Sequence, residues 1–112
     1  MSSSELCFKS AVQLSRMINK REVSSREVTE AHIEQIERLN PQINALCTFH
    51  PEAAIESAKK ADEQLSGGKS VGMLHGLPTA IKDTEPAKGM RYTEGSPIYK
   101  DRIAEEDSLI VE

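Results

Sequence analysis

The chain has 112 residues, which is at most one ordinary domain, and its net charge of -4 corresponds to a pI near 5.4. This acidic balance argues against a nucleic-acid surface or an acidic membrane surface as a direct partner. No apolar run approaches the length of a signal core or a membrane span, and the distant Cys7 and Cys47 are typical of two reduced thiols. We therefore expect a cytoplasmic protein.

The first predicted helix follows a flexible lead-in at residues 1–9. Ser10 can accept a hydrogen bond at the start of this helix, and Gln13, three residues later, completes a capping box. The apolar residues that follow share one helical face; they are Ala11, Leu14, Met17 and Ile18. A short amphipathic helix is the expected result.

A longer helix is predicted after Ser24, which again forms a capping box, here with Glu27. We expect this helix to end at Asn40-Pro41, because proline lacks the backbone donor that a helix needs. Its apolar stripe consists of Val28, Ala31, Ile36 and Leu39. His32 lies beside this stripe, where a packed histidine is expected and not a metal ligand.

A third helix is predicted to begin at Pro51, after a short strand over Ala45 to Phe49. The diglycine Gly67-Gly68 tolerates a left-handed turn and should end it. Small apolar residues repeat along the helix at spacings that permit close packing; they are Ala54, Ala58, Ala61 and Leu65.

The segment from Leu74 to Asp83 is the central stretch of the sequence. His75-Gly76 and Leu77-Pro78 exclude a helix, and residues 79–81 then predict a short buried strand that delivers Lys82 to its end. Two interpretations of this lysine stay open from its chemistry. It is a strand-end charge that reaches solvent, or it is a desolvated lysine that acts as a general base and activates a serine hydroxyl.

The remainder of the chain predicts a long shaped loop and the start of a further helix. The loop spans Thr84 to Asp101, where glycine and proline recur, and long ordered loops of this kind are often functional. Glu106-Asp107 is typical of a helix start, with residues 108–112 as its first turns.

Three short patterns are typical of other chemistries but are incomplete. Gly68-Lys69-Ser70 resembles the end of a phosphate-binding loop, but the glycine that this loop requires five residues earlier is absent. The pairs Ser57/Lys60 and Ser66/Lys69 have the Ser-x-x-Lys spacing without its partner motifs. Cys47 and His50 lack further residues at ligand spacing, so we expect no metal site.

A set of short motifs, taken together and in order, resembles the amino-terminal portion of the amidase signature family, the Ser-cisSer-Lys amide hydrolases. The resemblance runs from about Ser10 to the last residue. The motifs are Leu74-His75-Gly76-Leu77-Pro78, Ile81-Lys82-Asp83, Gly89, Thr93-Glu94-Gly95-Ser96 and Glu106-Asp107, with Leu39-Asn40-Pro41 and Ala61-Asp62 upstream.

The resemblance implies an α/β fold with a mixed central sheet flanked by helices. Residues 10–112 would be the amino-terminal part of an amidase domain, truncated before the catalytic serines. This fragment would contain mostly helices plus one or two short strands. A strand without sheet neighbours leaves backbone groups unpaired, so we expect a marginal fold.

The resemblance also implies a chemistry. Lys82 matches the base of the family's triad, which takes a proton from a serine in a cis peptide and so activates the nucleophilic serine. The substrate of the full-length protein would be a small-molecule amide: a small aliphatic or aryl amide, a lipid amide, or glutamine serving tRNA-linked amidation. No cofactor, metal, nucleic acid or membrane is implied as a partner, and a homodimer or a partner subunit both stay open.

The sequence departs from the family in one decisive respect, because the segment that carries both serines and the oxyanion loop is expected beyond residue 112. No such segment surrounds Ser2, Ser57, Ser66, Ser70, Ser96 or Ser108, so none of them can be assigned as the nucleophile. Arg91-Tyr92 also replaces small hydroxyl residues that often precede the Thr-x-Gly-Ser match. We expect no amidase activity from the chain alone, and the alternatives are a non-catalytic interaction module or a non-functional remnant of an amidase gene.

Overall fold

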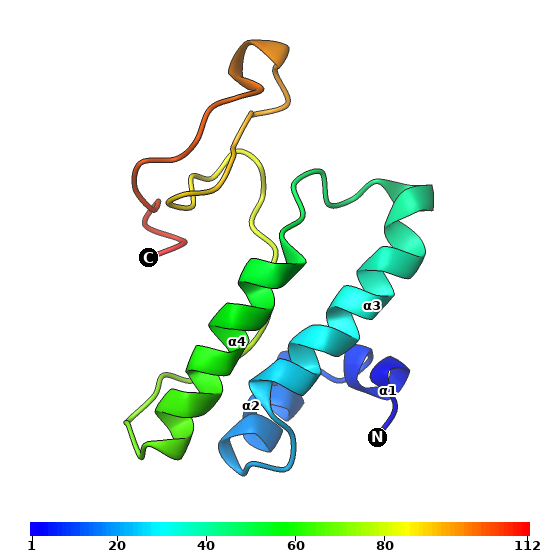
Figure 1. Ribbon diagram of the computed structural model, residues 1–112, viewed down its shortest axis with the longest axis vertical. Helices are drawn as coiled ribbons and strands as arrows, with labels where there is room; N and C mark the ends of the chain where they lie inside the picture. Colours follow the sequence, from blue (N-terminus) through cyan, green and yellow to red (C-terminus); the bar gives the residue numbers. More distant parts are fainter. The chain divides into compact units, whose positions relative to one another are not determined.

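The computed structural model describes all residues 1–112, which form α-helices, one short 3-10 helix and irregular segments (Figure 1). The chain divides into two compact units, Met1–Pro78 and Thr79–Glu112. All four α-helices belong to the first unit. None of them is both long and apolar enough to cross a lipid bilayer.

The expected lead-in is wrong in its secondary structure, because α1 occupies Ser3–Cys7. Ser2 caps this helix in a capping box with Glu5, a pattern that was predicted for two later helices but not for this one. The pKa of the Glu5 carboxyl lies below its usual value because the Ser2 backbone N–H, and then its hydroxyl, donate to it. Leu6 is buried, so the segment is part of the core.

The second helix, α2, spans Ala11–Asn19 and confirms the prediction that Ser10 and Gln13 form its capping box. Leu14 and Ile18 of its apolar face are buried, with Ile18 only 1% exposed. Ala11 is exposed, because it lies in the first turn at the edge of that face.

The longest helix, α3, spans Ser25–Ile43 and begins with the predicted Ser24–Glu27 capping box. Its expected end at Asn40-Pro41 is wrong by one turn, since the helix continues through Pro41. A proline near a helix end removes only one hydrogen bond, and Asn44 then closes the helix in the left-handed conformation, with a φ of 50° and its N–H 2.7 Å from the Asn40 carbonyl.

The strand expected over Ala45 to Phe49 is absent, and the segment is irregular. Asn40 accounts for this, because its side-chain amide donates to the Leu46 carbonyl at 2.9 Å and its side-chain oxygen accepts from the Leu46 N–H at 3.0 Å. The backbone N–H and carbonyl of Leu46, which a strand would offer to a neighbour, are thereby occupied within the turn.

The fourth helix, α4, spans Pro51–Ser66 and begins at Pro51 as predicted. Gly67 caps its C-terminal end at Ser66, and Gly68 follows with a φ of 75°, as the diglycine indicated. Within the first unit, α3 and α4 run side by side in opposite directions (Figure 1). Of the predicted seam, Ala58 is buried, Ala61 and Leu65 are half-buried, and Ala54 is exposed.

One apolar cluster forms the core of the first unit. The cluster combines side chains from α1, α2 and α3 with Val23 of the intervening turn; its buried members are Leu6, Leu14, Ile18, Val23, Val28 and Ala31. The half-buried side chains that pack against it are Cys7, Met17, Leu65 and Leu77. Leu77 is the link between this core and the central stretch of the sequence.

The second unit contains no strand, so the one or two short strands expected in this chain are wrong. At the predicted strand, Ile81 is 38% exposed and finds no neighbouring strand to pair with. The mixed central sheet of the fold-class expectation has no strand within residues 1–112 and stays a prediction. The nearest approach to pairing is a single antiparallel bridge between Arg91 and Ile103.

The predicted loop over residues 84–101 is irregular but ordered by backbone hydrogen bonds, and it includes the 3-10 helix η1, Pro97–Tyr99. The helix expected after Glu106-Asp107 is a turn. Only one helical i to i+4 bond forms there, from the Glu112 N–H to the Ser108 carbonyl at 2.9 Å. The Asp107 carboxylate accepts from the Lys88 N–H at 2.7 Å and does not cap a helix.

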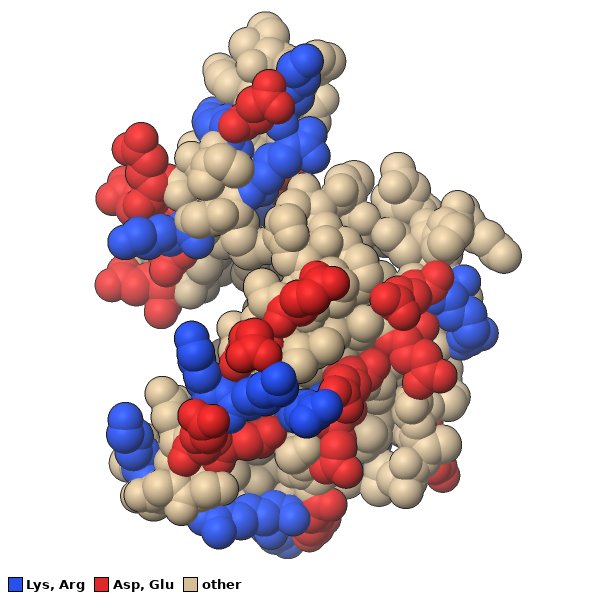
Figure 2. Space-filling model, in the orientation of Figure 1, with Lys and Arg blue, Asp and Glu red and all other residues tan.

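Charged side chains of both signs are interspersed over the molecular face shown in Figure 2. This mixture agrees with the 29% charged fraction of the sequence and with its modest net charge. It is typical of solvated helix faces.

Candidate functional site

The first half of the central stretch, His75 to Leu77, lies against the helices of the first unit. The His75 ring donates from Nε2 to the Ala61 carbonyl on α4 at 2.8 Å. The Ser25 hydroxyl at the start of α3 donates to the Gly76 carbonyl at 2.6 Å. Leu77 then packs against the apolar core. Three consecutive residues thus attach the chain to α4, to α3 and to the core.

Gly76 has to be glycine for two reasons. Its φ of 78° lies in the left-handed region of backbone conformations. Residues that carry a Cβ adopt this region only at a cost in conformational free energy. A Cβ at this position would also lie 3.0 Å from Ser25 Cβ and 3.4 Å from Ile18 Cγ2, and both neighbours are 1% exposed. This part of the motif is therefore explained by packing.

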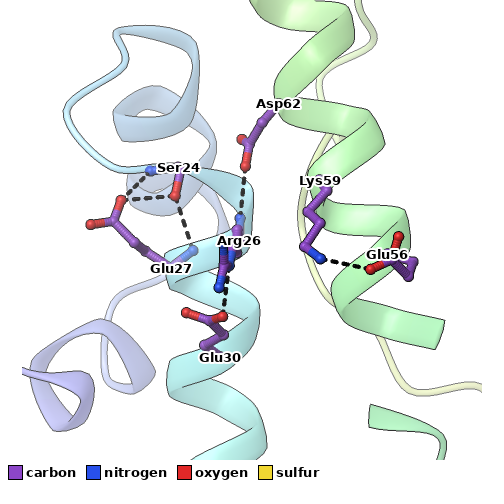
Figure 3. Close-up of polar contacts among 7 residues, drawn as sticks. All are labelled: Ser24, Arg26, Glu27, Glu30, Glu56, Lys59 and Asp62. Atoms are coloured by element: carbon purple, nitrogen blue, oxygen red, sulfur yellow. Dashed lines mark hydrogen bonds and ion pairs between the residues drawn. The ribbon is translucent and has the colours of Figure 1, made fainter. Parts of the chain in front are cut away.

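Asp62 fixes the position of Ser25, and sequence reasoning did not find this role. Its carboxylate oxygens accept from the Ser25 N–H at 2.7 Å and from the Arg26 N–H at 3.0 Å, so a side chain of α4 caps α3. Figure 3 shows the contact of Asp62 with Arg26. A helix N-terminus offers unpaired N–H groups and a partial positive charge, which favour a carboxylate. Only the Ala61-Asp62 match in the sequence pointed to this residue.

The other charged pairs of α3 and α4 lie within single helices. Arg26 pairs with Glu30 at 2.7 Å, and Lys59 pairs with Glu56 at 2.7 Å. Both pairs are drawn in Figure 3. These side chains are largely exposed, so the pairs contribute little to stability.

Lys82, the predicted base, lies in the second unit and is exposed. Its backbone carbonyl accepts from the Glu85 N–H at 2.9 Å, which folds the chain into a turn directly after the lysine. The Nζ atom makes no hydrogen bond, and none of the three ion pairs of the structure includes it. The ammonium is therefore free of protein partners in residues 1–112.

Asp83, the next residue, is bound to the segment around Thr93. The Asp83 carboxylate accepts from the Thr93 N–H at 2.8 Å and, through its second oxygen, from the Thr93 hydroxyl. These two donors, the hydroxyl first and the N–H second, lower the pKa of the Asp83 carboxyl. Two motifs that are ten residues apart in the sequence, Lys82-Asp83 and Thr93 to Ser96, are thereby brought together.

The turn after Thr93 has a left-handed backbone at two consecutive residues. Glu94 has a φ of 52° and Gly95 a φ of 71°, and the Ser96 N–H donates to the Thr93 carbonyl at 2.9 Å. The Glu94 N–H donates to the Asp83 carbonyl at 3.1 Å, which stabilises the otherwise uncommon conformation of Glu94.

Arg102 contacts Glu94 of this turn and the aromatic rings of the residues on either side of it. Its guanidinium lies over the rings of Tyr92 and Tyr99, 3.7 and 4.0 Å from their centroids, and 3.2 Å from the Glu94 carboxylate. Tyr92 is one of the two residues that replace the small hydroxyl residues of the family pattern. The larger side chain thus serves as a stacking surface for Arg102.

The other predicted positions have local structural roles or none. The serines Ser2 and Ser96 cap α1 and η1. The Cys47 thiol is directed at the Asn44 carbonyl, 3.9 Å away. The His32 ring contacts the backbone of its own helix, with Nδ1 2.7 Å from the Val28 carbonyl one turn earlier. A hollow of about 380 Å³ beside α1 and α3 is lined partly by glutamates and does not include Lys82.

Comparison with known proteins agrees with these motifs. The family model "Amidase" matches residues 27–112. The chain is 37% identical over 109 residues to a glutamyl-tRNA(Gln) amidotransferase subunit of Acidothermus cellulolyticus, and 41% identical over 100 residues to the corresponding subunit of Methylobacillus flagellatus. These matches cover 97% and 89% of this chain but only 22% and 20% of the relatives.

A solved structure is also similar, that of a bacterial aryl acylamidase of the amidase signature enzymes. It shares 32% sequence identity with this chain at a TM-score of 0.80, over 87% of this chain and 20% of that one. The chain belongs to the amidase family, and its structure matches the fold of an amidase signature enzyme. It spans about a fifth of the length of these relatives.

Proposed function

We propose that this chain supplies the lysine base of an amidase that hydrolyses a carboxamide C–N bond. The observation that carries the proposal is the family match over residues 27–112. This range includes the Ile81-Lys82-Asp83 segment that resembles the family's lysine motif, and Lys82 directly precedes the Asp83–Thr93 contact. The free Nζ of Lys82 supports the role, since a base needs an amine that no carboxylate has paired.

In the proposed reaction, neutral Lys82 takes a proton from a bridging serine, which takes one from the nucleophilic serine. The serine oxygen attacks the amide carbonyl, the C–N bond breaks, and ammonia or an amine leaves with a proton. Water then cleaves the acyl-enzyme to the acid, and backbone N–H groups stabilise the oxyanion. Both serines belong to a complete amidase domain, and we propose that residues 1–112 alone do not catalyse the reaction, because triad members act as a unit.

The names of the relatives support two substrate classes. Similarity to the aryl acylamidase supports an aryl amide as the substrate of the full-length protein. Similarity to the amidotransferase subunits supports instead an amide used in tRNA-linked amidation. Those relatives are named as subunits, which also supports a partner subunit, with a homodimer as the alternative. We propose a cytoplasmic location, since Cys7 and Cys47 are both free thiols.

A non-catalytic interaction module is the second candidate, and one observation favours it. The second unit exposes large apolar side chains, among them Ile98, Leu109 and Ile110, each more than 80% exposed. Side chains of this kind are typical of a surface that another chain segment covers.

The mass and the activity of the native product distinguish the amidase from the interaction module. It is captured from its source cells with an antibody raised to residues 10–66, and its intact mass and its release of ammonia or amine from amides are measured. We expect a species several times heavier than 12.4 kDa that hydrolyses an amide. The Lys82→Ala variant should lose this activity, whereas the matched Lys88→Ala variant should keep it. A native species of 12.4 kDa, or an active Lys82→Ala variant, would contradict the proposal.

A further inference from the structure

Lys82 and Asp83 carry opposite charges on adjacent residues, yet they do not pair with each other. The three ion pairs of the structure are Arg26–Glu30, Lys59–Glu56 and Arg102–Glu94. An exposed lysine beside a half-buried carboxylate is attracted to it electrostatically. The carboxylate of Asp83 is bound by another group instead.

Thr93 is that group. Its N–H donates to one carboxylate oxygen at 2.8 Å, and its hydroxyl donates to the other. Thr93 is 8% exposed, so it is fixed in place, and its hydroxyl oxygen also accepts from the Gly95 N–H at 3.2 Å. The Asp83 carboxylate is therefore engaged at both oxygens by one buried residue.

The backbone contacts strengthen this separation. The Asp83 carbonyl accepts from the Glu94 N–H at 3.1 Å, and the Lys82 carbonyl accepts from the Glu85 N–H at 2.9 Å. The Lys82–Asp83 peptide unit and the peptide unit that follows it are therefore held, and the Asp83 side chain is directed at Thr93.

We propose that Thr93 keeps Lys82 free to act as a base by occupying both oxygens of the Asp83 carboxylate. This inference rests on the function proposed above and deepens it, since it assigns Thr93 and Asp83 as positioning residues for Lys82. An ion pair with Asp83 would stabilise the Lys82 ammonium and would lower the fraction of neutral amine. The Thr93 hydroxyl competes with the lysine for the carboxylate and directs it at Thr93, which disfavours that pair.

The test measures how fast an amine-reactive ester labels Lys82 in the 112-residue chain, read by peptide mass spectrometry. Only the neutral amine reacts. In Thr93→Val the hydroxyl is lost at nearly constant volume, one oxygen of Asp83 is freed, and Lys82 should be labelled about two- to five-fold more slowly, as expected for an exposed ion pair. Lys69, in the first unit, should be labelled at an unchanged rate and serves as the internal control.

Two further variants separate an ion pair from a general loosening of the loop. Thr93→Ser keeps the hydroxyl and should keep the wild-type rate. The double variant Thr93→Val with Asp83→Asn has no carboxylate to pair with the lysine and should return to that rate. An unchanged rate in Thr93→Val, or a decrease that Asp83→Asn does not reverse, would overturn the inference. No substrate is involved, so failure of the labelling test is distinguishable from failure of the proposed amide hydrolysis.

Discussion

The two units of this chain are stabilised in different ways. The unit Met1–Pro78 buries an apolar cluster beneath capped helices. The unit Thr79–Glu112 has only Thr93 and Ala104 buried, and backbone hydrogen bonds with the contacts of Asp83 and Arg102 hold it together. Burial of apolar side chains is the main source of stability in the first unit, whereas hydrogen bonds and other polar contacts are the main source in the second.

This difference separates the family motif into two parts with different roles. The part from His75 to Leu77 belongs to the helical unit and is explained by packing. The part from Lys82 to Asp83 belongs to the polar unit, where the lysine has no packing role to explain it. The first part of a motif that is continuous in the sequence thus serves stability, whereas its second part is the one to which we assign a chemical role as a proposal.

The largest expected effect is on the apolar core. Ile18→Ala should destabilise the first unit by about 2–5 kcal/mol, because it removes a fully buried side chain and leaves a cavity. The matched control is Ile98→Ala in the second unit, where the side chain is 86% exposed and the change should lie within about 0.5 kcal/mol. Urea unfolding followed by far-UV circular dichroism measures both. Equal losses would contradict the contrast between the units.

A smaller effect is expected at the contact between α3 and α4. Asp62→Ala removes the acceptor for the Ser25 and Arg26 N–H groups and should cost about 1–2 kcal/mol. Asp62→Asn retains one side-chain oxygen and should lose less. The same urea unfolding experiment ranks the two variants, and a stability of Asp62→Ala equal to wild type would show that the cap contributes nothing.

The smallest expected effect is the loss of the Asp83–Thr93 contact of the second unit at acidic pH. The pKa of Asp83 is lowered in the folded chain, so its contact with Thr93 stabilises the fold fully above the ordinary value of 3.8 and is lost as the pH falls below that value. Exchange of the Thr93 amide hydrogen, corrected for its intrinsic pH dependence, should accelerate in that acid range. In Asp83→Asn the acceleration should be absent, and an identical acid response in this variant would contradict the assignment.

The helices could be predicted because their signals are local. Ser10 with Gln13, and Ser24 with Glu27, lie within one turn of each other, and the predicted helices begin after them. The expected strand at Ile81 failed because a strand depends on a neighbour that can lie anywhere in a chain, and none is present in residues 1–112. The end of α3 was missed because Asn44 closes it beyond Pro41.

The surroundings of Lys82 were the least predictable part. The resemblance indicated the lysine itself, and its role stays a prediction. No periodicity relates Asp83 to Thr93, ten residues away, because the intervening loop is irregular. The same holds for Asp62 and Ser25, which meet only after α3 and α4 have packed. Contacts of this kind arise from tertiary structure, and a single sequence does not encode them as a local pattern.

The most direct test of this division of the motif compares the melting temperatures of Gly76→Ala and Lys82→Ala. A Cβ at residue 76 meets Ser25 and forces a left-handed alanine, which should cost at least about 1 kcal/mol and lower the Tm by about 4–8 °C or more. Lys82→Ala removes an exposed side chain without partners and should leave the Tm unchanged. A decrease in Lys82→Ala as large as that in Gly76→Ala would show that the lysine is structural and would contradict the account.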